Sequence, residues 1–315
     1  MGSEQEQTAI IHLSYCLRRA WDRRISQDYR FWMSDGFEND NAMFETGKRD
    51  FEYLTEGLAL AEFKGKCALE IGCGVGRLLQ QSKNIFESVI AVDISNNAIN
   101  KAHQLLSDTS NVYFIKNDGY QLEDVSDNSV DFVYSFATLS HISSRMFAGY
   151  LMEICRVIKE NGICRLQLYL GTESETVEAD SLAIRCYDQG CLKRAVRLAG
   201  LKVTDVQRFE LAETIVTPQG EQIPSIVTLR RQREPLADRE EIAAHLRFHP
   251  EIQVAAAWDD APLECQLMMS LGSRLIQEGN LHSALQTYEK IINFYGQYAR
   301  DAERIIFALR KSLQK

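Results

Sequence analysis

Three glycines spaced two residues apart, Gly72, Gly74 and Gly76, follow an apolar run and precede the start of a helical pattern. A backbone without Cβ can turn sharply and let a ligand approach closely. An apolar strand, a glycine turn and a helix in that order form a unit that cradles a nucleotide. Glu70 precedes the first glycine by two residues, and the spacing differs from the Gly-x-Gly-x-x-Gly of dinucleotide enzymes. The loop alone also fits another mononucleotide binder or an ordinary tight turn.

A carboxylate follows the next apolar segment, residues 88–92, at Asp93. Asp93 lies 17 residues beyond Gly76 (93 − 76), close to the roughly 20 expected of a ribose-binding acid. A carboxylate only accepts hydrogen bonds, so it suits the two hydroxyls of a ribose and repels a 2′-phosphate. Taken alone, an acid here is most often a helix-start residue favoured by the helix dipole.

Two further apolar segments, residues 112–115 and 129–136, repeat this strand-then-polar pattern. The four motifs, in this order and spacing, resemble the class I S-adenosylmethionine (SAM) dependent methyltransferases over roughly residues 51–230. The resemblance implies an α/β fold: a Rossmann-like, seven-stranded, mostly parallel sheet with helices on both faces. Its last two strands would be residues 201–209 and 225–229, joined by the turn-rich segment 217–220.

The same resemblance implies SAM as the cofactor and S-adenosyl-L-homocysteine (SAH) as the product. Within it, Asp118 would accept from the adenine amino group, and Phe136 would lie near the reacting methyl group. Taken alone, an aspartate before a glycine, as at Asp118, is more often part of a plain turn. The implied cofactor-binding residues are Glu70, Gly72, Cys73, Gly74, Gly76, Asp93, Ile94, Asn117, Asp118, Gly119 and Phe136.

Methyl transfer from a sulfonium needs few catalytic groups, because the methyl group is already activated and its transfer is an in-line displacement. The enzyme aligns a nucleophile and excludes water. A base helps only where the acceptor starts out protonated. His141, shortly after the fourth predicted strand, is the candidate base because its titration range suits that role, and the alternative is a structural histidine. Tyr169, at the end of the fifth strand, is a second candidate, and no metal-ligand cluster appears in the sequence.

The N-terminal segment, residues 1–50, predicts a helical cap over the SAM-binding domain at 51–232. Its first part has an apolar stripe at helical spacing, and its second part is rich in aromatics between residues 29 and 37. Such aromatics suit a lid that excludes water around a cation, and they equally suit plain packing against the sheet. Arg49 is a candidate, on charge alone, for meeting the methionine carboxylate of SAM.

The C-terminal region, residues 233–315, is predicted to be helical, with a break at Pro250. Small and large residues from 271 to 291 match the tetratricopeptide (TPR) pattern, in which small residues let two helices pack closely. The alternative is a helical hairpin with coincidental spacing. Because one repeat cannot bury its faces alone, this region is expected to contact the catalytic domain, another protein or a second copy.

Bulk properties fit a cytoplasmic enzyme with free thiols. The net charge of −9 argues against a nucleic-acid substrate, and no apolar run approaches the length of a membrane span. The eight cysteines include no Cys-x-x-Cys pair. The leading prediction is methylation of an oxygen or nitrogen of a small molecule, such as a sugar or natural-product intermediate. The alternatives are a protein methyltransferase docking through its tail, and a SAM-binding scaffold without catalysis.

Overall fold

The computed structural model describes residues 2–34, 36, 39–171, 184–209, 215–217, 220–246, 261–296 and 300–314. Its centre is a sheet whose main path runs β3-β2-β1-β4-β5-β9-β7. The five strands from β3 to β5 are parallel, and β9 is antiparallel to both of its neighbours. The strands are β1 (Cys67–Ile71), β2 (Ser88–Asp93), β3 (Val112–Lys116), β4 (Val130–Ser135), β5 (Ile158–Gly171), β7 (Leu201–Arg208) and β9 (Gly220–Arg231).

The predicted fold class is confirmed by this path of seven strands. Two short strands lie beside it: β6 (Cys186–Tyr187) pairs with β5, and β8 (Ile215–Thr217) pairs with β9. The predicted turn at 217–220 therefore joins β8 to β9, because Thr217 pairs with Gly220, and it does not lead directly from β7. The central strands β1 and β4 are buried along almost their whole length because helices cover both faces of the sheet.

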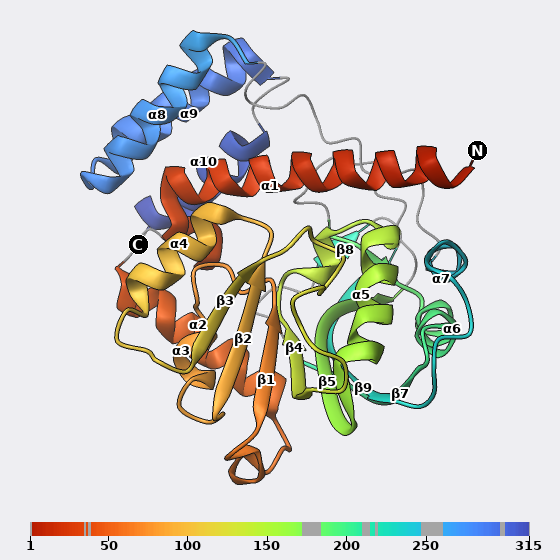
Figure 1. Cartoon of the computed structure of the whole chain (residues 1–315). Helices are drawn as coiled ribbons and strands as arrows, with labels where there is room; N and C mark the ends of the chain where they lie inside the picture. Colours follow the sequence, from red (N-terminus) through yellow and green to blue (C-terminus); the bar gives the residue numbers. More distant parts are fainter. Residues whose placement is uncertain are drawn as a thin grey trace.

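Two layers of helices cover the sheet (Figure 1). One face packs against α2 (Asp40–Thr55), η1 (Leu60–Phe63), α3 (Leu79–Ser82) and α4 (Asn96–Leu105). The other packs against α5 (Ser144–Val157), α6 (Gln189–Leu198) and α7 (Arg239–His245). Side chains of Ser95, Ser143 and Asp188 cap the first turns of α4, α5 and α6. The short η2 (Leu139–His141) leads from β4 into α5.

The first helix, α1 (Gly2–Ser34), lies across the carboxyl ends of the strands (Figure 1). Its apolar stripe is buried at Ile10, Leu13 and Leu17, as predicted. The helix is broken at Asp28, where φ is −162° and ψ is 93°. The predicted boundary at residue 50 falls inside α2, which packs against α3 within the central domain.

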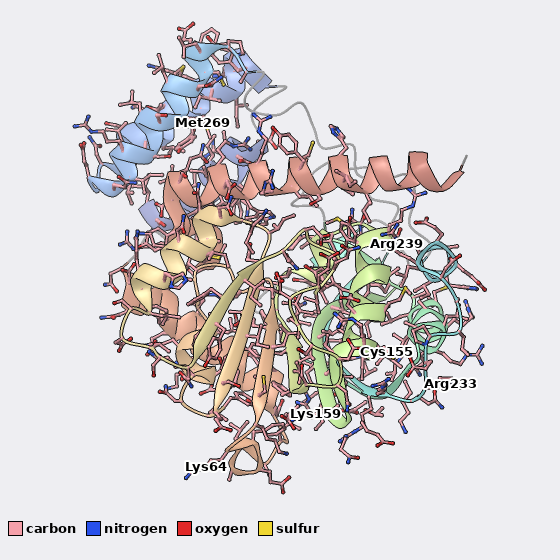
Figure 2. The ribbon with its side chains drawn as sticks, in the orientation of Figure 1. Lys64, Cys155, Lys159, Arg233, Arg239 and Met269 are labelled. Atoms are coloured by element: carbon pink, nitrogen blue, oxygen red, sulfur yellow. The ribbon has the colours of Figure 1, made fainter. Side chains whose placement is uncertain are left out.

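The C-terminal helices α8 (Leu263–Gln277), α9 (Leu281–Tyr295) and α10 (Arg300–Leu313) stack side by side (Figure 1). Gly272 of α8 faces Tyr288 of α9 so closely that a Cβ would lie 2.7 Å from the ring. This close pair is what both interpretations of the sequence require, and the TPR assignment remains a prediction. In Figure 2, Met269 marks these helices on the side of α1 away from the sheet.

A buried ion pair fastens the C-terminal helices to α1. Arg24, only 1% exposed, donates to Asp301 of α10 at 2.9 Å. The guanidinium also lies over the rings of Trp21 and Trp32, 5.1 and 5.0 Å from their centroids. Phe31 and Trp32 complete the contact by packing into the core of the helical hairpin. Across the described ranges, no helix combines the length and apolar composition that a membrane crossing requires.

Candidate active site

The glycine loop is fixed by hydrogen bonds to the neighbouring strand. The amides of Gly72 and Cys73 both donate to the carbonyl of Val92, at 2.9 and 3.0 Å. Gly72, Gly74 and Gly76 all have positive φ, which side chains other than glycine rarely adopt. A Cβ on Gly72 would lie 2.3 Å from the Thr138 side chain. The loop therefore needs glycine both for its conformation and for the close approach of the β4 loop.

Asp93, at the carboxyl end of β2, ties this loop to the start of α4. Its carboxylate accepts from the amide of Gly74 and from the amide of Ser95, each at 2.8 Å. Burial raises the pKa of Asp93, while the amides of Ser95 and Gly74 act to lower it. The cap helix approaches the same place, because Asp22 accepts from the Ser95 hydroxyl at 2.7 Å and the Asn97 amide at 3.0 Å.

Glu70, the last but one residue of β1, is 2% exposed. The Tyr134 hydroxyl donates to it at 3.0 Å. Burial raises the pKa of Glu70 to about 8, although Tyr134 and Arg77 act to lower it. Two carboxyl groups, Glu70 and Asp93, therefore flank the glycine loop.

A cavity opens between these strand ends and the cap helix. The space between its walls is about 1000 Å³, a figure that includes the open solvent at its mouth. Cap residues form one wall: Leu17, Trp21, Ile25, Trp32 and Met33. Central-domain residues form the rest: Glu70, Gly72, Cys73, Gly74, Arg77, Leu78, Asp93, Ile94, Ser95, Ala98, Gly119, Phe136, Ala137, Thr138, His141, Ile142, Met146 and Tyr150.

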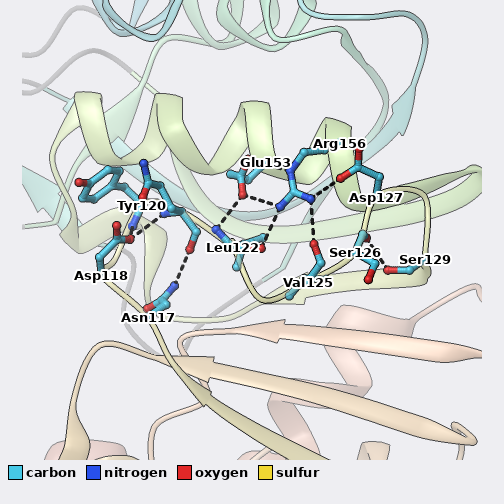
Figure 3. Close-up of polar contacts among 11 residues, drawn as sticks. Asn117, Asp118, Tyr120, Leu122, Val125, Ser126, Asp127, Ser129, Glu153 and Arg156 are labelled. Carbon is cyan, nitrogen blue, oxygen red and sulfur yellow. Dashed lines mark hydrogen bonds and ion pairs between the residues drawn. The ribbon is translucent and has the colours of Figure 1, made fainter.

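Most of the residues predicted to bind the cofactor line this cavity, and three do not. Gly76 lies at the far side of the loop, where a Cβ would meet Leu106. Asn117 donates to the Tyr150 hydroxyl at 2.7 Å, behind the wall. The Asp118 carboxylate turns back and accepts from the amides of Tyr120 and Gln121, at 3.0 and 2.8 Å (Figure 3). The cavity wall at this turn is Gly119.

The acceptor end of the cavity is formed by the segment after β4. Phe136 and His141 both line it, and the His141 amide donates to the Thr138 carbonyl at 3.0 Å. Ala137 has a positive φ of 52°, unusual for a residue with a side chain. Tyr169, the other candidate, pairs with Cys186 of β6 and lies outside the lining.

The sequence was compared with models of known protein families. Residues 69–166 match a family model described as a methyltransferase domain. Within these matched residues the chain is similar to SAM-dependent methyltransferases of class I.

The chain is 27% identical over 146 residues to phosphoethanolamine N-methyltransferase 1 of Triticum aestivum. The match takes in 45% of this chain and 29% of that relative, so the chain spans less than a third of its length. Among solved structures, it resembles the Burkholderia thailandensis 1,6-didemethyltoxoflavin-N1-methyltransferase with bound 1,6-didemethyltoxoflavin and SAH. The TM-score is 0.51 at 16% identity, over 70% of this chain and 89% of that one, and the likeness concerns the fold.

Sequence reasoning missed the basic residue of the cavity. Arg77 lines it and pairs with Asp50 of α2. Arg49, the residue proposed on charge alone, lies outside the lining, with a side chain 60% exposed. The position of Arg77, directly after the third glycine, was the signal available in the sequence. Among the described residues, no group of three or more His, Cys, Asp and Glu is arranged to hold a metal ion.

Protonation of Glu70 should make the stability of this protein depend on pH. Because the pKa of Glu70 is raised from 4.5 to about 8, the folded state binds an extra proton between those values. The free energy of unfolding should therefore fall as pH rises from about 5 to about 8, by at most about 1.4 kcal/mol per pH unit. Urea unfolding of the SAH-free protein measures it, and Glu70→Gln should flatten the profile. Parallel profiles for the two proteins would contradict the assignment.

Proposed function

We propose that this protein transfers the methyl group of SAM to an oxygen or nitrogen of a small molecule. The observation that carries the proposal is the cavity itself, in which a glycine loop and two buried carboxyl groups lie beneath a cap of aromatic side chains. That arrangement places hydrogen-bond acceptors inside a cavity that the cap shields from water.

The residues of the cavity fit SAM by chemistry. The ribose hydroxyls are donors, and Asp93 is an acceptor at the strand end beside the loop. The methionine part carries an ammonium, from which the Glu70 carboxyl can accept a hydrogen bond, and a carboxylate, which Arg77 matches in charge. Trp21, Trp32 and Phe136 offer aromatic faces to a positive sulfonium. Bound SAM supplies the activated methyl group.

The chain's own residues then have two tasks. The first is to exclude water, which α1 does by covering the strand ends with Leu17, Trp21 and Met33. The second is to hold the acceptor and, where it starts out protonated, take its proton. We assign to a ring nitrogen of His141 the role of accepting the proton of the methyl acceptor, because His141 lines the cavity.

A small acceptor is favoured over a polypeptide by the cap. The α1 helix crosses the strand ends and is held there by hydrogen bonds from Ser95 and Asn97 to Asp22. The wheat relative is also named for N-methylation of a small molecule, phosphoethanolamine.

Two measurements test this function. Calorimetry with SAH should give saturable heat, and SAM carrying a labelled methyl group should label small molecules in a cell extract. The variant His141→Gln should bind SAH unchanged and lose transfer by about 100-fold or more. Label found only in the protein fraction would favour a protein methyltransferase, and SAH binding without any label would leave a scaffold. No heat with SAH would overturn the proposal.

A further inference from the structure

Three buried polar groups belong to the cavity segment 136–142 or to residues hydrogen-bonded to it, and none of the three has a hydrogen-bond partner among the described residues. They are the Ser140 hydroxyl, the Gln167 amide nitrogen and the Nη1 atom of Arg185. The Gln167 amide oxygen accepts from the Ala137 amide at 3.0 Å, so that side chain is fixed at the back of the segment. All three unmet groups can donate, and what they lack is an oxygen acceptor.

Arg185 is the charged member of this cluster. Its amide donates to the Ser140 carbonyl at 2.9 Å, next to His141 of the cavity wall. The following residue, Cys186, pairs with Tyr169 of β5, which fixes the backbone. Only 7% of Arg185 is exposed, and within the described ranges its guanidinium makes no ion pair. Burial lowers the pKa of Arg185 to about 10, with Tyr187 acting against it.

A buried guanidinium without a counter-ion destabilises a fold, because its desolvation is not offset. Such a group is expected where a ligand supplies the missing charge. Its planar fork of donors matches the two oxygens of a carboxylate or phosphate. The amide nitrogen of Gln167 and the hydroxyl of Ser140 are further buried donors in residues that belong to the same segment or are bonded to it. Arg185 itself lies outside the cavity lining and is joined to the segment through its backbone amide.

We propose that Arg185 is a specificity-determining residue that binds an oxyanion group, carboxylate or phosphate, on the methyl acceptor. This inference rests on the proposed function and narrows the acceptor to an anionic small molecule. The acceptor oxyanion and the cofactor then occupy regions of opposite charge, since the loop region carries Asp93 and the segment after β4 is hydrogen-bonded to the backbone of Arg185.

A counter-ion from the chain itself is the competing explanation. The segment 172–183, outside the described residues, contains Glu173, Glu175, Glu178 and Asp180. If one of them paired with Arg185, the arginine would be structural, and removing it would lower stability. If Arg185 awaits a ligand, Arg185→Met should raise the melting temperature of the ligand-free protein by about 2 °C or more. A lowered melting temperature would overturn the proposal.

Anion binding gives the direct test. SAH-loaded protein is titrated with inorganic phosphate and with acetate at constant ionic strength, and binding is followed by calorimetry. Arg185→Gln should weaken binding of the preferred anion at least tenfold, Arg185→Lys should weaken it less, and the stronger anion identifies the group. Arg197→Gln, which removes an exposed charge from α6, is the matched control and should bind as the unaltered protein does. Equal anion binding by all variants, or none by any, would overturn the proposal.

The charge of the methylated product separates this inference from the proposed function. Small molecules labelled in the extract should be retained by an anion exchanger at pH 7, and Arg185→Gln should reduce that label at least tenfold while SAH binding is unchanged. A neutral or cationic labelled product would overturn the inference and leave the methyltransferase function intact. If no label appears, the proposed function fails, and the anion titration still decides whether Arg185 binds an oxyanion.

Discussion

Replacing Asp93 with alanine should weaken SAH binding by about 1–3 kcal/mol, a rise in Kd of roughly 5-fold to 150-fold. The reason is twofold. The carboxylate is the acceptor assigned to the ribose hydroxyls, and it also holds the Gly74 and Ser95 amides at 2.8 Å. Removing it deletes a ligand contact and loosens the loop that forms the cavity floor. Calorimetry with SAH measures the effect.

Two companion variants separate these causes. Asp93→Asn keeps the size of the side chain and its amide oxygen, so it should retain one of the two backbone contacts and lose part of the affinity. Asp108→Ala removes an acid whose side chain is 82% exposed and paired with Lys83, so it should leave the Kd unchanged. If Asp93→Ala bound SAH as tightly as the unaltered chain, the ribose assignment would be wrong.

Local sequence was enough to predict the loop and the acid that holds it. Gly72 and Gly74 have positive φ for reasons that spacing and flanking residues already indicate, and Asp93 ends a short apolar strand. The parallel strands bring both to one edge, so Gly74 and Asp93, which are 19 residues apart in sequence (93 − 74), are joined by one hydrogen bond in space. The fold class followed because four motifs in order leave few arrangements of the strands.

Side-chain direction could not be predicted in the same way. Asp118 stands where the family implies a ligand contact, but an aspartate followed by a turn can accept from its own backbone, and here it accepts from the Tyr120 and Gln121 amides (Figure 3). A short-range hydrogen bond of this kind leaves no signature in spacing. Arg77 and Arg49 carry the same charge and differ in the helix or loop on which they lie. Charge alone therefore could not predict which of the two lines the cavity.

Contacts between segments that are distant in sequence also could not be predicted. The apolar stripe of α1 was visible in the sequence, but its docking site was not, because it depends on residues more than 70 positions away. Asp22 accepts from Ser95 and Asn97 at the start of α4, and Ser14 donates to the Asp118 carbonyl at 2.5 Å. These bonds turn an amphipathic helix into the wall of a cavity. The lid therefore depends on tertiary pairing that single-segment patterns do not encode.

Asp301→Ala should cost about 3–5 kcal/mol of unfolding free energy, because it removes the carboxylate that is ion-paired with the buried guanidinium of Arg24. Although burial acts to raise it, Arg24 and Arg23 hold the pKa of Asp301 below its ordinary value. The pair therefore stabilises the fold at neutral pH, and its contribution is lost as the pH falls through the lowered pKa of Asp301. Urea unfolding at pH 7 measures the loss.

The double variant Arg24→Met with Asp301→Leu is the decisive control, since it removes both charges and keeps the volume apolar. It should recover most of the stability, whereas Asp301→Ala alone does not. Trp21 and Trp32, which stack on Arg24, also line the cavity, so loosening this contact should speed SAH dissociation as well. A stopped-flow dissociation rate unchanged by Asp301→Ala, in a protein that has lost stability, would mean that the C-terminal helices stabilise the chain without holding the lid.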